Sequence, residues 1–135
     1  MALEILHRER EGIALIDLHG RITAGEEVGL FRAAFENITV SPPRLIINMK
    51  NVDYVDSTGL GALVMCSTRL RKLDGAARLI HVNRRNIELL VMTKIDTIFE
   101  VFDDEVDAIN SFFPGRAMKR FDILSFVRQL EKEEE

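Results

Sequence analysis

The chain has 135 residues, enough for one domain with a hydrophobic core and too few for two domains of usual size. Its 47% hydrophobic and 30% charged residues are typical of a folded globular protein and not of a disordered one. The net charge of −4 gives the chain no overall basic character, so we expect no direct nucleic-acid binding. Apolar runs such as residues 89–92 are far shorter than the roughly 20 residues that cross a bilayer, so we expect no membrane span.

The N-terminal part of the chain predicts a hairpin followed by a helix. Apolar and polar residues alternate in residues 3–8 and 12–18, and Glu11-Gly12 between them is typical of a turn. Thr23 and Glu26 match a capping box, which predicts that a helix begins there with Thr23 as its N-cap. Apolar residues at helical spacing predict the face of this helix that packs inward, namely Val28, Phe31, Ala34, Phe35 and Ile38.

Residues 41–113 predict alternating strands and helices. Ser41-Pro42-Pro43 should end the first helix, and residues 45–47 form an apolar run expected to be a short strand covered on both faces. A loop should follow as far as Asp56. Helical spacing then predicts a second helix from Ser57 to about Lys72. The remaining expected elements are an end of that helix at Asp74-Gly75, a strand at 77–82, a helix capped by Asn83 with Ile87, Leu90 and Val91 inward, a strand at 98–102 and a helix at 104–113.

This order of elements predicts an α/β fold. Strands separated by helices imply crossover connections, so we expect a mixed, mostly parallel sheet of four to five strands with helices packed against it. Residues 1–114 would form this domain. Residues 115–135, after Pro114-Gly115, predict an added C-terminal helix that buries its apolar stripe on the domain or across a homodimer; the stripe is Phe121, Leu124, Val127 and Leu130.

The most unusual stretch is residues 56–61, Asp-Ser-Thr-Gly-Leu-Gly. Gly59 and Gly61 lie in the opening turn of a helix, where each costs about 1 kcal/mol relative to alanine, so a need other than helix propensity accounts for them. Glycine lets another surface approach the backbone. One interpretation is that Ser57 or Thr58 only caps the helix. The other interpretation is that a hydroxyl here is phosphorylated. A helix start tolerates the added dianion, so the fold would persist, whereas a docked partner does not tolerate it, so binding would be lost.

The segment Arg44-Leu45-Ile46-Ile47-Asn48-Met49, followed by Val55-Asp56-Ser57-Thr58-Gly59-Leu60-Gly61, resembles the strand, loop and helix start of STAS domains of the anti-sigma factor antagonist type. The order of elements from Leu3 to about Phe113 agrees with that family. The resemblance implies a non-enzymatic switch of sporulation or general-stress regulation. In that family an anti-sigma factor, itself an ATP-dependent serine kinase, phosphorylates the serine after the aspartate, here Ser57. The unphosphorylated antagonist binds the anti-sigma factor and frees the sigma factor, and a PP2C-type phosphatase resets the modified form.

We expect the partner to bind around Ser57. Asp56 would shape the local field, Thr58 would be a cap or second contact, and an exposed Met65 on the outer face of the second helix suits a docking surface. That outer face is predicted to hold Ala62, Met65, Arg69 and Lys72. The full predicted partner-binding set is Asp56, Ser57, Thr58, Gly59, Leu60, Gly61, Met65, Arg69, Arg21 and Thr23.

One segment departs from the family pattern. Many relatives have Gly-Glu-Leu-Asp after the second strand, where this chain has Gly20-Arg21-Ile22-Thr23. A base and a hydroxyl therefore replace two acids in a loop that lies near the partner surface in the family. This leaves open a second interpretation, in which the chain is a STAS interaction module of another complex, such as a lipid-transport or signalling assembly, without control by phosphorylation.

The sequence offers no catalytic constellation. His7, His19 and His81 fall on three predicted strands, and no cysteine or carboxylate spacing completes a metal site. Gly59-Leu60-Gly61 lacks the third glycine of a dinucleotide-binding fingerprint, because Val64 stands there. No phosphate loop and no Gly-x-Ser-x-Gly motif is present. We therefore predict no catalytic residue, no metal and no cofactor.

The N-terminus and the cysteine content favour the cytoplasm. The first residues lack the charged and long apolar segments of a secretory signal. Cys66 is the single cysteine, so it cannot form an internal disulfide, which agrees with a reducing compartment. It lies in an apolar stretch, and we expect a buried, inert thiol.

Overall fold

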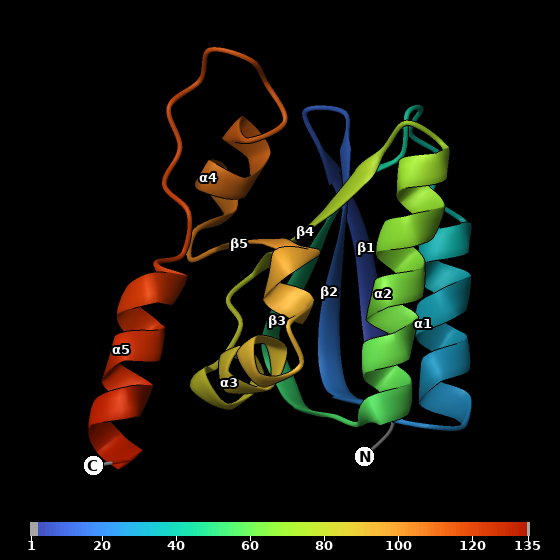
Figure 1. The fold of residues 1–135 in the computed structure, drawn as a ribbon. Helices are drawn as coiled ribbons and strands as arrows, with labels where there is room; N and C mark the ends of the chain where they lie inside the picture. The colour runs from blue at the N-terminus through green and yellow to red at the C-terminus, as the bar shows by residue number, and fades with distance from the viewer. Residues whose placement is uncertain (1–2, 135) are drawn as a thin grey trace.

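Five strands form one sheet in the order β1-β2-β3-β4-β5, in which β1 runs antiparallel to β2 and the other neighbours are parallel (Figure 1). The structure is a computed structural model that describes residues 3–134. The elements are β1 (Glu4–Arg10), β2 (Ile13–Ile22), α1 (Glu26–Glu36), β3 (Arg44–Val55), α2 (Ser57–Lys72), β4 (Ala76–Ile80), α3 (Arg84–Met92), the 3-10 turn η1 (Ile95–Thr97), β5 (Glu100–Phe102), α4 (Glu105–Asn110) and α5 (Ile123–Glu134).

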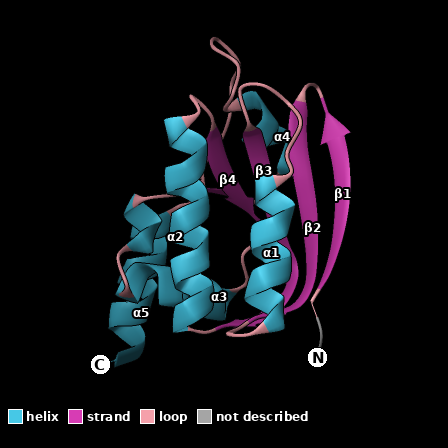
Figure 2. Cartoon of the chain, turned by 90° about the vertical axis from the view of Figure 1, so that its right-hand side faces the viewer, coloured by secondary structure: helices cyan, strands magenta, loops and turns pink. Residues whose placement is uncertain are grey.

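The helices cover the two faces of the sheet unequally. Figure 2 shows α1 and α2 in front of the strands and α4 behind them. The larger core lies under α1, α2 and α3, where Phe31, Leu63 and Ile87 are buried against the sheet. The smaller core lies under α4 and contains Ile46 and Phe102. The predicted mixed, mostly parallel sheet is therefore confirmed.

The predicted hairpin is confirmed, and its turn has the backbone that the sequence indicates. Glu11 and Gly12 both have positive φ, 52° and 76°. Two successive residues of this kind are typical of the tight turns that match the right-handed twist of paired strands. β1 then pairs with β2 along its whole length, from Glu4 opposite His19 to Arg10 opposite Ile13.

β3 is much longer than the three-residue strand predicted. Leu45, Ile46 and Ile47 have no exposed surface, as expected for a strand covered on both faces. The chain does not form a loop after them, because residues as far as Val55 continue to pair with β2 across two register shifts. Polar residues in the second half of β3 interrupt the apolar pattern and conceal the strand in the sequence.

The prediction that Thr23 caps the first helix is wrong. α1 begins at Glu26 with Gly25 at the N-cap position, in a backbone conformation with φ 103° and with no side-chain cap. The Thr23 carbonyl instead accepts a bond from Val28 N at 3.2 Å. The helix also ends at Glu36, before the prolines, and the Asn37 side chain donates to the Ala33 carbonyl at 2.7 Å.

α2 has the predicted bounds, Ser57 to Lys72, but its faces differ in one respect from those predicted. Leu60, Leu63 and Leu70 face the core as expected. Ala62, which we predicted to face outward, is buried, whereas Met65 is 45% exposed. The reason is that α1 packs beside α2 and covers a wider arc of its surface than a single stripe.

α3 is capped by Asn83, as predicted, and the same region completes the hydrogen bonding of β3. β4 pairs only with the first residues of β3, Arg44 to Asn48, so the later part of β3 has no strand on that side. Asn83 and the buried Asn86 both donate through Nδ2 to the Val52 carbonyl, at 3.1 and 3.0 Å. Two side chains thus replace the missing ladder bond.

The added C-terminal helix is confirmed, but its predicted stripe is partly wrong. α5 begins at Ile123, after Phe121, whose N–H donates to the Val101 carbonyl at 2.8 Å. Phe126 packs against the core together with Phe121, while Leu124 is 62% exposed. The predicted stripe counted Phe121 as its first helical residue. Phe121 lies outside the helix, so the face inferred from it is not the one that packs. Within residues 3–134 no helix combines the length and the apolar content that a membrane crossing requires.

The asparagine contacts to Val52 predict a measurable contribution to stability. Asn86→Ala removes a buried hydrogen bond, and we expect the free energy of unfolding to fall by about 1–2 kcal/mol. Met92→Ala, on the exposed side of the same helix, should change it by less than about 0.5 kcal/mol. Denaturant unfolding of the two variants measures both values, and equal effects would contradict the proposed role of Asn86.

Candidate functional site

Asp56 joins the start of α2 to the loop that follows β2. It is the N-cap of α2, and its Oδ1 accepts a hydrogen bond from Gly59 N at 2.8 Å. Its Oδ2 accepts one from Ala24 N at 2.9 Å, in the loop before α1. These two N–H groups, that of Ala24 first, hold the pKa of the Asp56 carboxyl below its usual value. The bonds to the carboxylate are therefore fully present at neutral pH and weaken only in acid, as the pH falls through that lowered pKa.

Ser57 and Thr58 occupy the first turn of α2 and are exposed. Neither is the N-cap, which corrects the interpretation that one of their hydroxyls merely caps the helix. No side-chain hydrogen bond within residues 3–134 involves either hydroxyl; the one cap bond at this helix start belongs to Asp56. Changing the chemistry of Ser57 therefore removes no hydrogen bond of the fold.

A largely apolar groove of about 450 Å³ lies between α2 and α3, and Ser57 is part of its wall. We call it the Ser57 groove. Its most exposed apolar side chain is Met92, at 73%, and Arg85 stacks over the Tyr54 ring with 5.0 Å between the guanidinium carbon and the ring centroid. The residues that line the Ser57 groove are Tyr54, Val55, Asp56, Ser57, Leu60, Arg85, Asn86, Glu88, Leu89, Met92 and Thr93.

The α3 side of this groove was not predicted from the sequence. The inward stripe of α3 was identified, and the opposite side of the helix then includes Met92. The sequence thus held a signal for an exposed Met92. Tyr54 was missed because it was assigned to a loop, whereas it lies near the end of β3. The structure therefore adds two exposed apolar side chains to the surroundings of Ser57.

A second groove of about 480 Å³ lies between α1 and α2, and we call it the α1–α2 groove. It brings together three of the predicted partner-binding residues, Gly61, Met65 and Arg69. Asp56, Ser57 and Leu60 belong instead to the Ser57 groove. The predicted set is thus divided between two depressions on either side of α2.

Arg21 and Thr23 occupy different environments. Ile22 is buried in the core under α1 and α2, so its strand neighbour Arg21 projects from the opposite face of the sheet. Arg21 pairs in register with Tyr54. Thr23 precedes Ala24, whose N–H binds Asp56, so the Thr23 loop lies beside the start of α2. The structure brings Thr23 to the start of α2. Arg21 lines neither groove, but it lies beside Tyr54, which lines the Ser57 groove.

The two glycines of α2 differ in what surrounds them. A Cβ on Gly59 would overlap the carbonyl oxygen of Ile22 and lie 2.9 Å from Val55 Cγ1. Gly59 is therefore required by the fold, where α2 crosses the end of β2. A Cβ on Gly61 would meet nothing within 4 Å. Gly61 alone leaves an open surface that another molecule can approach.

This difference predicts opposite effects of one substitution. Gly59→Ala should lower the free energy of unfolding by about 1–3 kcal/mol, because backbone atoms must move to admit the methyl group. Gly61→Ala should raise it by up to about 1 kcal/mol, because alanine favours the helix and meets no obstacle. Thermal or denaturant unfolding of the pair tests this, and a loss of stability in Gly61→Ala would show that its surroundings are closed.

The histidines and the cysteine do not form a reactive centre in the described part of the chain. His7 lies on β1, His19 on β2 and His81 after β4. Among residues 3–134 no group of three or more His, Cys, Asp and Glu side chains is placed to hold a metal ion. Cys66 is fully buried, as predicted, and burial raises the pKa of its thiol to about 12, which disfavours the reactive thiolate.

Comparison with known proteins identifies one domain family. The sequence profile of the STAS domain matches residues 4–108, which is most of the chain. A curated relative, a STAS-domain containing protein of Pseudomonas aeruginosa, is 23% identical over 86 residues, which cover 64% of this chain and 84% of that protein.

Solved structures with the same fold include antagonists of anti-sigma factors. One from Mycobacterium paratuberculosis matches with a TM-score of 0.70 and 22% identity, over 82% of this chain and 93% of that one. The phosphorylated form of the Bacillus cell fate determinant SpoIIAA matches with a TM-score of 0.62 and 17% identity, over 81% and 99%. A murine Solute Carrier 26 anion transporter matches with a TM-score of 0.65 and 20% identity, over 76% of this chain and 18% of the transporter. At these identities the likeness establishes the fold.

Proposed function

Because the chain belongs to the STAS domain family, we propose that it is an anti-sigma factor antagonist whose binding is switched by phosphorylation of Ser57. In the unphosphorylated form it binds an anti-sigma factor that is also a serine kinase, and thereby frees a sigma factor for transcription. A PP2C-type phosphatase restores the phosphorylated chain to this form. The observation that carries the proposal is that the Ser57 hydroxyl is exposed at the start of α2 while Asp56 does the capping.

The separation of these two roles is what a switch at this position needs. A phosphoryl group replaces a neutral hydroxyl by about −1.5 to −2 charges at neutral pH. At the start of α2 the helix dipole and free backbone N–H groups favour negative charge, and water screens its repulsion by Asp56. The fold is therefore expected to persist. A docked protein surface would instead enclose the dianion without water or a countercharge, which costs several kcal/mol.

The two grooves beside α2 extend the proposed contact surface beyond the serine. The Ser57 groove offers the apolar side chains of Leu60, Tyr54 and Met92, which suit an apolar side chain of the partner. The α1–α2 groove offers Met65 and Arg69 beside the open surface at Gly61. Thr58 and Thr23 adjoin the serine, and Gly59 acts through the fold. Arg21 lies beside Tyr54, at the margin of the Ser57 groove.

The serine switch makes a direct binding prediction. Affinity capture from the native cells should recover an anti-sigma factor with a kinase domain, and mass spectrometry should find phosphate on Ser57. Purified Ser57→Asp should bind that factor at least about tenfold more weakly than the wild type, a loss of about 1.4 kcal/mol. Ser57→Ala is the matched control and should bind as the wild type does. Isothermal titration calorimetry measures the affinities, and equal binding of Ser57→Asp and Ser57→Ala would contradict the switch.

A second candidate function rests on the loop after β2. Arg21 and Thr23 stand where many anti-sigma factor antagonists carry acids, which changes the charge that a partner meets. In this alternative the chain is an interaction module of another assembly, for example one of lipid transport or signalling, and phosphorylation has no role. The captured partner would then lack a kinase domain and would bind the wild type and Ser57→Asp with equal affinity.

A further inference from the structure

The two edges of the sheet differ in what covers them. At the β5 edge, Phe121 N donates to the Val101 carbonyl and Arg120 pairs with Glu100 at 2.9 Å, so the chain's own C-terminal segment covers this strand. At the other edge, β1 pairs with β2, and no described strand lies on its outer side. Half of the backbone N–H and C=O groups of Glu4–Arg10 therefore face outward, a template for one more strand.

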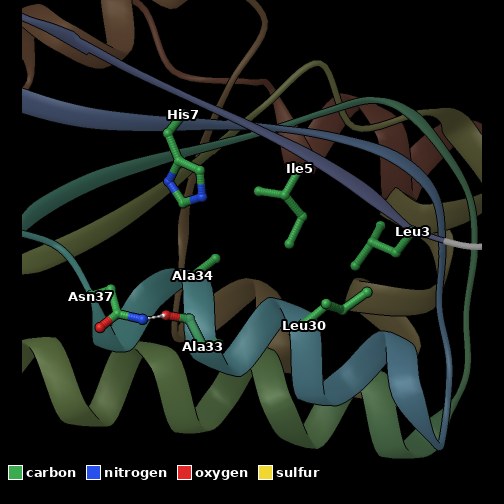
Figure 3. Close-up of a pocket in the computed structure, with 7 residues that line it drawn as sticks. All are labelled: Leu3, Ile5, His7, Leu30, Ala33, Ala34 and Asn37. Atoms are coloured by element: carbon green, nitrogen blue, oxygen red, sulfur yellow. Dashed lines mark hydrogen bonds between the residues drawn. The ribbon is translucent and has the colours of Figure 1, made fainter.

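Apolar surface flanks this open edge on both faces of the sheet. On one face, a groove of about 310 Å³ separates β1 from α1 (Figure 3). Leu3 and Ile5 point from the strand toward the helix there, and Leu30 on α1 is 41% exposed. On the other face Leu6 is 68% exposed. Two of the large apolar side chains that the fold leaves in solvent thus lie at the same edge.

We propose that a second copy of this chain covers the edge, by antiparallel pairing of β1 with β1 about a two-fold axis at Leu6. Antiparallel self-pairing is symmetric, so each residue lies opposite the residue of the second copy that is equally far from the axis on its other side. About Leu6, the two Leu6 side chains face each other, and Glu4 of each copy lies opposite Arg8 of the second copy. Opposite charges in such cross-strand pairs are favourable, and an apolar pair at the axis is removed from water.

The pattern of residues along β1 selects this register over its neighbour. Pairing about His7 would set Leu6 opposite Arg8 of the second copy and Ile5 opposite Glu9, so apolar side chains would face charges. It would also place two histidines together at the axis. Pairing about Leu6 keeps the exposed Leu6 away from charges and the two histidines apart. It sets Ile5 opposite His7 of the second copy, and Leu3 opposite Glu9, but Leu3 is buried in its own fold. The Arg8 side chain, paired with Asp17 and Glu105, is 39% exposed.

The helix beside the groove is compatible with a second copy. The groove-lining residues Leu30, Ala33 and Asn37 of α1 follow helical spacing and form one stripe along the edge. In the symmetric pair, the two α1 helices lie on the same face of the joined sheet, one on each side of the axis. Ala33 is small and permits close approach, and the exposed Leu30 of each copy gains an apolar neighbour.

This dimer is independent of the proposed function. The Ser57 groove lies between α2 and α3, whereas the dimer edge lies beyond α1, at the opposite side of α2. The Ser57 groove and the groove at the dimer edge share no lining residue. Failure of the serine switch would therefore leave the dimer prediction unchanged, and the reverse holds as well.

The oligomeric state of the full chain tests the proposal. Sedimentation equilibrium should give a mass of twice 15.4 kDa at micromolar concentration. Leu6→Arg places two like charges at the axis and should raise the dimer dissociation constant at least about tenfold. Leu124→Arg, at a similarly exposed position on α5, is the control and should leave the dimer intact. A monomeric wild type, a dimer that Leu6→Arg does not weaken, or a dimer that Leu124→Arg weakens as much would each overturn the proposal.

Cross-linking tests the register. Opposed residues of an antiparallel pair have Cα atoms about 4.5–5.5 Å apart, within the range of a disulfide. Leu6→Cys should therefore form a covalent dimer under mild oxidation, seen on a non-reducing gel, while the buried Cys66 does not interfere. Met92→Cys, more exposed but distant from β1, should not cross-link at the same protein concentration. Equal cross-linking of the two variants would refute the Leu6 axis.

Discussion

The arrangement of the site depends on the Asp56 carboxylate, which binds two backbone N–H groups from different parts of the chain. One belongs to Gly59 in the first turn of α2 and the other to Ala24 in the loop before α1. The ends of β2 and β3 are thereby tied together at the point where α2 begins. Gly59 contributes by its lack of a side chain, because α2 can then lie against the Ile22 carbonyl. Ser57 is positioned by this frame without being part of it.

This division of labour explains how one residue can carry a regulatory charge. A serine that capped its own helix would lose the cap when modified, and folding and binding would change together. Here Asp56 keeps the cap, and the serine side chain lies in the wall of an apolar groove between α2 and α3. A change at Ser57 is therefore directed at what docks there. The edge strand β1 lies on the far side of α1, so self-association need not compete with that docking.

Much of the fold could be predicted from the sequence because its signals are local. Alternation identified the hairpin, helical spacing gave α2 its bounds, and Asn83 marked the start of α3. The errors arose where distant residues decide. Thr23 has the chemistry of a cap, yet Asp56, 32 residues after Ala24, binds that loop. The second half of β3 is polar in sequence and becomes a strand because β2 pairs with it. Likewise, the place of Arg21 beside Tyr54, which lines the Ser57 groove, depends on the pairing of β2 with β3.

The central claim is that Asp56, and not Ser57, maintains the start of α2. Thermal unfolding of Asp56→Ala and Ser57→Ala, followed side by side by circular dichroism, tests it most directly. Loss of the cap should lower the Tm of Asp56→Ala by about 4 °C or more, whereas the Tm of Ser57→Ala should stay within about 1 °C of the wild type. A comparable loss in Ser57→Ala would show that the hydroxyl supports the fold, and the account would then be wrong.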